Sequence, residues 1–171
     1  MAKPYTDEEL QILTDCPKII KNGPKKAMST EGQYQRSEMD LIAEDNDALT
    51  FHVFMRRNLN LKEDFPIGLN FRHIEERDII CLLRCNGPHG IFLGQRDPDN
   101  HYFKHHIHRA KQSNLEAGQK PEKGGEETTA YASYEDALTY FLTIINVQNV
   151  DEFFPDRRQP PLFLLSDEDE G

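Results

Sequence analysis

Three histidines lie within four positions, His105, His106 and His108, and this is the part of the sequence best equipped for chemistry. In a β-strand, His106 and His108 point to one face, roughly 7 Å apart along the chain, and His105 points to the other face. Two imidazoles on one face suit proton transfer, metal ligation or, when protonated, phosphate binding. His89 follows an upstream strand and would converge on this pair if the two strands are neighbours.

The leading hypothesis is metal-independent acid–base chemistry. His106 or His108 would remove a proton from a ribose 2′-hydroxyl, and another histidine would protonate the leaving oxygen. Cationic side chains nearby would stabilise the charged phosphate. This hypothesis makes His89, His106 and His108 the candidate catalytic residues and requires no cofactor. The candidate substrate-binding residues are Arg84, Lys104, His105, Arg109 and Arg56.

Two other hypotheses stay open at this stage. Three histidines suffice for a catalytic zinc ion that keeps an open position, and Asp97 and Asp99 are candidate carboxylates in the loop before the second strand. Otherwise the histidines form a polar sheet face that recognises a ligand or orders a loop. The sequence contains no P-loop, GxGxxG, GxSxG or HExxH motif, so none of the chemistries that depend on those motifs is indicated.

Charge is distributed unevenly along the chain. The net charge is −10 over 171 residues, which argues against nonspecific nucleic-acid binding. Between His52 and Arg109, however, nine Lys and Arg residues outnumber seven Asp and Glu residues, and all seven histidines lie there. A mildly basic centre inside an acidic envelope permits an anionic ligand at one local site.

The cysteines and the N-terminus bear on the cellular compartment. Cys16, Cys81 and Cys85 are odd in number and form no CxxC motif, so neither a disulfide framework nor a cysteine zinc site is expected. The first residues, MAKPYTDEEL, contain no apolar signal-peptide core, and no apolar run approaches the roughly 20 residues of a membrane span. These features predict a cytoplasmic protein without membrane contact.

Capping residues and hydrophobic periodicity predict the elements that position these side chains. Thr6-x-x-Glu9 predicts a capping box on a short N-terminal helix that Pro17 limits. Alternating apolar residues predict strands at 49–55 and 67–71, and the doubly apolar stretch 78–85 predicts a central strand. Further strands are expected at 102–109 and, as an edge strand, at 39–44. Ser133 is the predicted N-cap of a late helix with a buried stripe of Ala137, Leu138, Phe141, Leu142 and Ile145.

The expected fold class is α+β, with an antiparallel sheet of about four to six strands, a C-terminal helix packed on one face and a short N-terminal helix. The expected organisation is an N-terminal helix and linker at 1–36 and a core domain at 37–155. A mobile insert is expected at 111–129, and a proline-containing acidic tail at 156–171.

Two segments of the chain together resemble a known family. Asn86-Gly87-Pro88-His89 and Phe103-Lys104-His105-His106-Ile107-His108 are similar to the N-A-P-H … F-P-H-H-x-H core of TumE-type toxin components of prokaryotic toxin–antitoxin pairs. They are also similar to a broader set of small bacterial proteins with a G-x-P-H … H-x-H core. The resemblance covers the chain roughly from Leu49 to Pro155.

Carried over residue by residue, the resemblance points to His89, His106 and His108, with His105 matching only the toxin form. Two positions depart from the toxin pattern: Cys85 replaces an acidic residue, and Lys104 replaces the proline before the paired histidines. The insert at 111–129 and both tails lie outside the resemblance.

The resemblance implies a toxin-like or phage-defence-associated effector. Its targets would be nucleic acid or the translation machinery, and its protein partner would be an antitoxin or a complex subunit. Together with the clustered histidines, this makes a small ribonuclease acting on RNA the leading function. The alternatives are a His-ligated metalloprotein and a non-catalytic binding or adaptor subunit that docks through a sheet edge and the apolar patch Leu162–Leu165.

Overall fold

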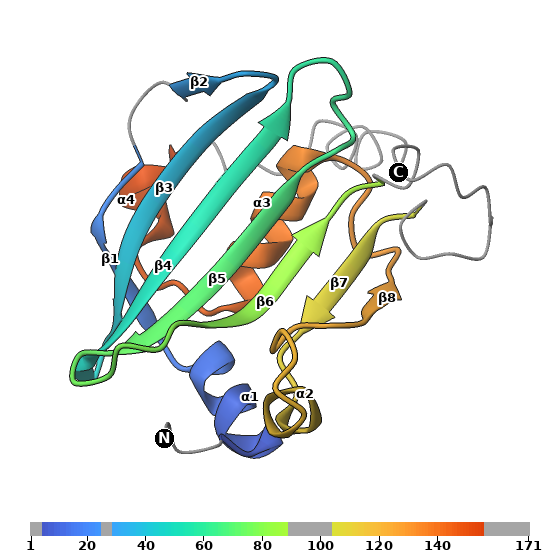
Figure 1. The fold of residues 1–171 in the computed structure, drawn as a ribbon. Helices are drawn as coiled ribbons and strands as arrows, with labels where there is room; N and C mark the ends of the chain where they lie inside the picture. Colours follow the sequence, from blue (N-terminus) through green and yellow to red (C-terminus); the bar gives the residue numbers. More distant parts are fainter. Residues whose placement is uncertain (1–4, 25–28, 89–103, 156–171) are drawn as a thin grey trace, which may run out of the picture.

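The computed structural model describes residues 5–24, 29–88 and 104–155, which fold into eight strands and four helices (Figure 1). The strands are β1 (Lys18–Asn22), β2 (Ser29–Glu31), β3 (Tyr34–Ala43), β4 (Asn46–Asn58), β5 (Pro66–His73), β6 (Ile80–Asn86), β7 (His106–Arg109) and β8 (Gly125–Glu127). The helices are α1 (Asp7–Asp15), α2 (Gln112–Glu116), α3 (Tyr134–Ile144) and α4 (Val150–Phe153).

The strands form one antiparallel sheet in the order β1-β3-β4-β5-β6-β7-β8, and β2 pairs with β3 outside that path. The α+β class and the antiparallel sheet are therefore confirmed, but the sheet is larger than the four to six strands expected. The additional strands β1, β2 and β8 are only three to five residues long, and β2 and β8 are polar, so none of them shows a hydrophobic alternation long enough to predict a strand. The segment 39–44, expected at an edge, belongs to the interior strand β3.

Both predicted helix caps are present in the structure. Thr6 Oγ1 accepts a hydrogen bond from the Glu9 amide (3.1 Å), and the Glu9 carboxylate accepts one from the Thr6 amide (2.9 Å). Ser133 Oγ accepts a hydrogen bond from the Asp136 amide (3.1 Å) at the start of α3. The segment expected as a mobile insert, 111–129, contains α2 and β8, and β8 pairs with β7.

The hydrophobic core lies between the sheet and α3, which crosses one face of the sheet in Figure 1. We call this face the inner face. Along β4, Phe51, Val53 and Met55 are buried in the core, while His52 and Phe54 point to the opposite, outer face. The predicted stripe of α3 is confirmed, because all five of its residues are buried: Ala137, Leu138, Phe141, Leu142 and Ile145.

The end of α3 leads the chain to the edge of the sheet. Asn146 has a positive φ of 62°, a conformation that asparagine tolerates, and the amide of Val147 donates to the carbonyl of Leu142 (3.3 Å). This Schellman turn places 146–149 beside β1, where the Asn149 amide group bonds both the N–H and the C=O of Ile20 (2.9 and 3.1 Å). The outer edge of β1 is thereby covered by the chain itself.

Lys18 is a fully buried cation at the point where α1, β1 and α3 meet. Its Nζ donates to the carbonyls of Thr14 (2.7 Å), Cys16 (2.9 Å) and Ile145 (2.9 Å), and it lies 4.7 Å from the centre of the Phe51 ring. The Thr14 and Ile145 carbonyls belong to the C-terminal turns of α1 and α3, where a positive charge is favoured by the helix dipole. Burial lowers the pKa of Lys18 to about 8.

Among the residues that the structure describes, no helix is both long and apolar enough to cross a membrane. The longest of them, α3, has 11 residues.

Replacing Lys18 with methionine keeps the apolar stem and removes the ammonium group. Three buried carbonyls then lose their donor, so we expect the free energy of unfolding to fall by about 2–4 kcal/mol. Chemical denaturation measures this change, and Lys21→Met, an exposed lysine on the same strand, is the control. A loss for Lys18→Met no larger than that for Lys21→Met would contradict the anchoring role.

The difference in stability between the wild type and Lys18→Met should also depend on pH. The pKa of Lys18 is lower in the folded chain, about 8, than its ordinary value of 10.5, so between these pH values the unfolded state binds more protons. Stability from this group therefore rises with pH across that window, and the stability gap between wild type and Lys18→Met should widen by up to about 3 kcal/mol. A gap that is constant from pH 7 to 11 would argue against a desolvated Lys18.

Candidate functional site

His106 and His108 lie on the outer face of the sheet, on β7, which pairs with β6. The strands β6 and β7 are paired, with Asn86 opposite His106 and Arg84 opposite His108. The rings of His106 and His108 lie side by side, their centres 5.0 Å apart, as the spacing in the sequence predicted. His89 lies outside the described residues, so its convergence on this pair stays a prediction.

Both histidines are held by backbone carbonyls. His106 Nδ1 lies 2.7 Å from the carbonyl oxygen of Lys104, and His108 Nδ1 lies 3.1 Å from that of Glu122. A carbonyl oxygen only accepts, so each Nδ1 carries the proton and donates it. The Nε2 atom is then the nitrogen with the lone pair whenever the ring is neutral. This tautomer suits either a general base or a metal ligand.

The histidine pair is shielded from solvent. His106 is 0% exposed and His108 is 3% exposed. A catalytic base must come within hydrogen-bond distance of its substrate, so a large substrate such as RNA has no direct access to these imidazoles. Their burial is the observation that the sequence pattern did not predict, because it depends on tertiary packing.

Glu122 is a functional candidate that the sequence pattern did not single out. Its backbone carbonyl holds His108, while its carboxylate lies 3.7 Å from the Arg84 guanidinium, and both side chains are largely buried. Asn114 fixes this segment by donating to the carbonyls of Pro121 (2.9 Å) and Lys123 (3.0 Å). We use the name histidine cluster for Arg84, Asn86, His106, His108 and Glu122.

The other predicted site residues do not join the histidine cluster as one site. Lys104 is exposed and pairs with Glu127 at 3.2 Å. His105 points to the inner face, where it packs against Phe65 and Tyr131, and burial lowers its pKa. Arg109 and Arg56 are exposed. The Arg56 guanidinium lies 5.7 Å from the centre of the Phe54 ring on β4.

One row of directly opposed residues links the histidine cluster to β3. The row runs through Glu38, Phe54, Gly68, Arg84, His108 and Gly125 on six consecutive strands of the sheet. Within it, the Phe54 ring covers Gly68, because a Cβ atom built there would lie 2.1 Å from Phe54 Cζ. The Phe54 ring therefore separates the outer face into the histidine cluster on one side and a second polar group on β3 and β4 on the other.

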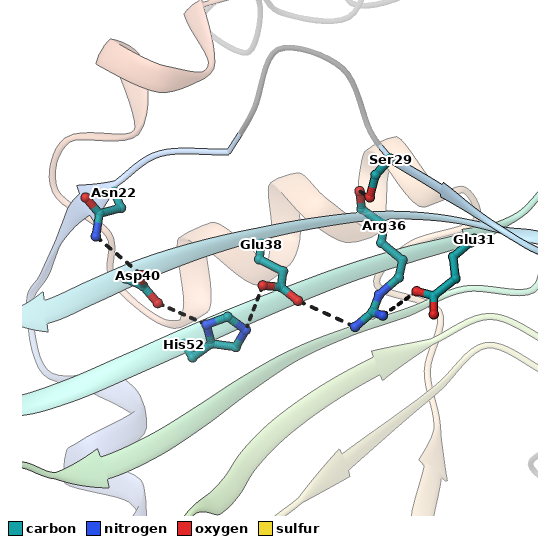
Figure 2. A network of polar contacts seen from close by, with 7 residues as sticks. All are labelled: Asn22, Ser29, Glu31, Arg36, Glu38, Asp40 and His52. Carbon is teal, nitrogen blue, oxygen red and sulfur yellow. Dashed lines mark hydrogen bonds and ion pairs between the residues drawn. The ribbon is translucent and has the colours of Figure 1, made fainter.

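This second group is a chain of polar contacts across β1, β2, β3 and β4, which we call the β3–β4 network (Figure 2). Its members are Asn22, Ser29, Glu31, Arg36, Glu38, Asp40 and His52. His52 lies between two carboxylates, with Nδ1 3.0 Å from Asp40 Oδ1 and Nε2 3.8 Å from Glu38 Oε2. Arg36 pairs with Glu38 at 3.5 Å and with Glu31. The hydrogen bond from His52 is the main reason that the pKa of Asp40 is lowered.

A row of polar side chains that lie directly opposite one another runs across the strands through this network. Asn22, Asp40, His52 and Asn70 lie directly opposite one another on β1, β3, β4 and β5. Asn22 Nδ2 donates to Asp40 Oδ2 at 3.3 Å. Two hollows of about 380 and 540 Å³ adjoin along the row and share Asn22, Asp40 and His52. Together they form what we call the outer groove.

The sequence pattern did not assign a function to the β3–β4 network. Its members come from four strands, and only the register of the sheet brings them together. The available signal was the alternation of Glu38 and Asp40 with buried Met39 and Leu41, which places both carboxylates on one face. That pattern is also typical of an ordinary solvated sheet face.

The metal-site hypothesis has no support from the described part of the chain. Within 5–24, 29–88 and 104–155, no group of three or more His, Cys, Asp or Glu residues is placed to hold a metal ion. His89, Asp97 and Asp99, which the hypothesis also named, lie outside these residues.

Comparison of the chain with protein-family models, curated proteins and solved structures gave no significant match. The resemblance to TumE-type toxins therefore stays a prediction that rests on the residues quoted for it.

The carbonyl contacts of His106 and His108 predict an unusual tautomer that can be observed directly. At mildly alkaline pH, the imidazole ¹⁵N spectrum of the protein should contain His106 and His108 protonated on Nδ1, together with His52, whose Nδ1 faces the Asp40 carboxylate, whereas a solvated histidine favours Nε2. Loss of one of these signals in each of His106→Asn and His108→Asn assigns the two buried rings. Two Nε2-protonated rings at these positions would contradict the geometry.

Proposed function

We propose that this domain is a non-catalytic protein-binding subunit that docks a partner on its outer face, at the outer groove. The observation that supports this most is accessibility. The side chains of Asp40, Glu38 and His52 are 56%, 52% and 39% exposed, whereas His106 and His108 are almost completely buried. Recognition needs exposed groups with fixed positions, and the β3–β4 network supplies them.

The network favours recognition over a purely structural role. Ion pairs between exposed side chains contribute little to folding stability, so Asp40, Glu38 and Arg36 are not needed to hold β3 against β4. The backbone ladder of ten registered residue pairs already does that. The side-chain contacts order the network, because each of Asn22, Arg36, Glu38, Asp40 and His52 contacts at least one neighbouring side chain. Ordered polar groups lining a hollow reduce the entropy cost of binding.

Docking on the face is better supported than docking on an edge of the sheet. The outer edge of β1 is covered by 146–149. The edge strand β8 is three residues long and carries exposed Glu126 and Glu127, which disfavour pairing with another strand. The patch Leu162–Leu165, expected from the sequence as a docking element, lies outside the described residues.

The biological setting rests on the sequence resemblance. A domain that binds a protein partner fits a toxin-like or defence-associated complex, in which the partner is an antitoxin or another subunit. The acidic net charge of −10 also favours a protein partner over nonspecific contact with nucleic acid.

Capture of proteins from the source cells tests this function. The double variant Asp40→Asn with His52→Gln removes the centre of the β3–β4 network without removing core side chains. We expect the amount of protein that it captures to be at least tenfold lower than for the wild-type chain. Lys104→Gln, which breaks the exposed pair with Glu127 at 3.2 Å, is the matched control and should retain them. Equal capture by all three chains would refute docking at the outer groove.

Acid–base catalysis by the histidine cluster is the second candidate. It is favoured by two imidazoles locked in the same tautomer beside the cationic Arg84. If this candidate is right, the purified chain cleaves RNA in the presence of a chelator. The rate of cleavage then falls by about 10²-fold or more in His108→Asn. Asparagine keeps a donor near the position of Nδ1 and removes Nε2, so the fold is preserved. We expect no cleavage by the wild-type chain. Cleavage that is present in the wild type and lost in His108→Asn would overturn the non-catalytic function.

A further inference from the structure

The outer groove carries opposite charges at its two ends. The smaller hollow is lined by three carboxylates, Glu31, Glu38 and Asp40, against the single guanidinium of Arg36. The larger hollow is lined by two cations, Lys21 and Arg72, against the shared carboxylate of Asp40. The groove is therefore acidic at one end and basic at the other, with the Asn22–Asp40–His52 contacts at its centre.

The register of the sheet gives the separation of the two ends along the strand direction, with β3 and β5 on either side of β4. Glu38 lies opposite Phe54, and four residues further along the strands Ile42 lies opposite Thr50, which lies opposite Arg72. Four residues of strand span roughly 13 Å. An extended peptide has the same rise per residue, and its side chains at positions i and i+4 point to the same side.

The walls of the groove also suit a peptide backbone. Its centre presents amide, carboxylate and imidazole groups from Asn22, Asp40 and His52, which can meet both N–H and C=O groups. The basic end adds an apolar contact, because Ile79 is 61% exposed and lines the same hollow. Polar groups at the centre and an exposed aliphatic side chain at one end are typical of a surface that binds a segment of another protein.

We infer that the outer groove binds an extended peptide segment whose cationic side chain and anionic side chain are four positions apart. The cation lies against Glu38 and Asp40, and the anion lies in the larger hollow, which Lys21 and Arg72 line. This inference rests on the proposed protein-binding function and names the partner's chemistry. Either chain direction of the peptide satisfies the same charge order.

Synthetic peptides test the inference without knowledge of the partner. The probes are three short serine peptides with blocked ends, which differ only at two positions four residues apart. The first carries Arg and Asp at these positions, the second carries two Arg, and the third carries two Asp. Calorimetric titration of the wild-type domain should favour the Arg/Asp peptide over both others, by roughly two- to fivefold for each mismatched charge, the range of exposed ion pairs. No binding of any peptide, or equal binding of all three, would overturn the inference.

The same titrations with a charge-reversed variant test which end of the groove binds the cation. Glu38→Arg leaves two carboxylates and two cations at the acidic end, so the variant should lose the preference for the Arg/Asp peptide over the two-Asp peptide, whereas Glu152→Arg on α4, an exposed position, should keep the wild-type order. An unchanged preference in Glu38→Arg would also overturn the inference. If the peptides fail but Asp40→Asn with His52→Gln still releases captured proteins, the binding function stands and only the peptide chemistry is wrong. If both fail, the proposed function fails as well.

Discussion

The buried ammonium group of Lys18 is the contact on which the arrangement of this domain most depends. It joins carbonyls at the ends of α1 and α3 to the first strand of the sheet, across 127 residues of sequence in the case of Ile145. Taking a charge out of water is costly, and the three carbonyls offset part of that cost, since burial still lowers the pKa of Lys18 to about 8. Lys18 thus fixes β1 to the ends of both helices, and β1 pairs with β3 in a register that, after a shift between Ile20 and Asn22, sets Asn22 opposite Asp40.

The outer face follows from that register. The inner face is committed to packing against α3, so every polar side chain that alternates with the core residues of β3, β4 and β5 must point outward. Directly opposed positions then form rows across the sheet, and two of these rows contain His108 and His52. Phe54, packed over Gly68, divides the two groups. One group is buried and locked by carbonyls, and the other is exposed and ordered by its own side chains.

Local patterns were sufficient to predict part of this structure. The capping residues Thr6 and Ser133, the stripe of α3 and the shared face of His106 and His108 were predicted, because each depends on neighbours a few residues away. The short strands β1, β2 and β8 were missed, since three to five residues are too few to show an alternating pattern and pairing with longer strands orders them. The partners of Lys18 and the role of Glu122 depend on contacts distant in sequence, and no local pattern encodes them.

The candidate site changed for the same reason. The spacing of the histidines correctly predicted their direction, but whether solvent reaches them depends on how the rest of the chain packs around them. The β3–β4 network has no single motif, because Asn22, Glu31, Asp40 and His52 each come from a different strand. Sequence periodicity gives the face of each residue, and only the register brings them together.

The histidine side chains themselves provide the most direct test of where the partner binds. In a ¹³C-labelled sample, the imidazole Cε1 signals of His52, His106 and His108 can be followed as the captured partner is added, with His52→Gln identifying the first of them. The account predicts that the His52 signal shifts while those of His106 and His108 stay in place. Shifts of the His106 and His108 signals with an unchanged His52 signal would contradict it and would place the partner at the histidine cluster.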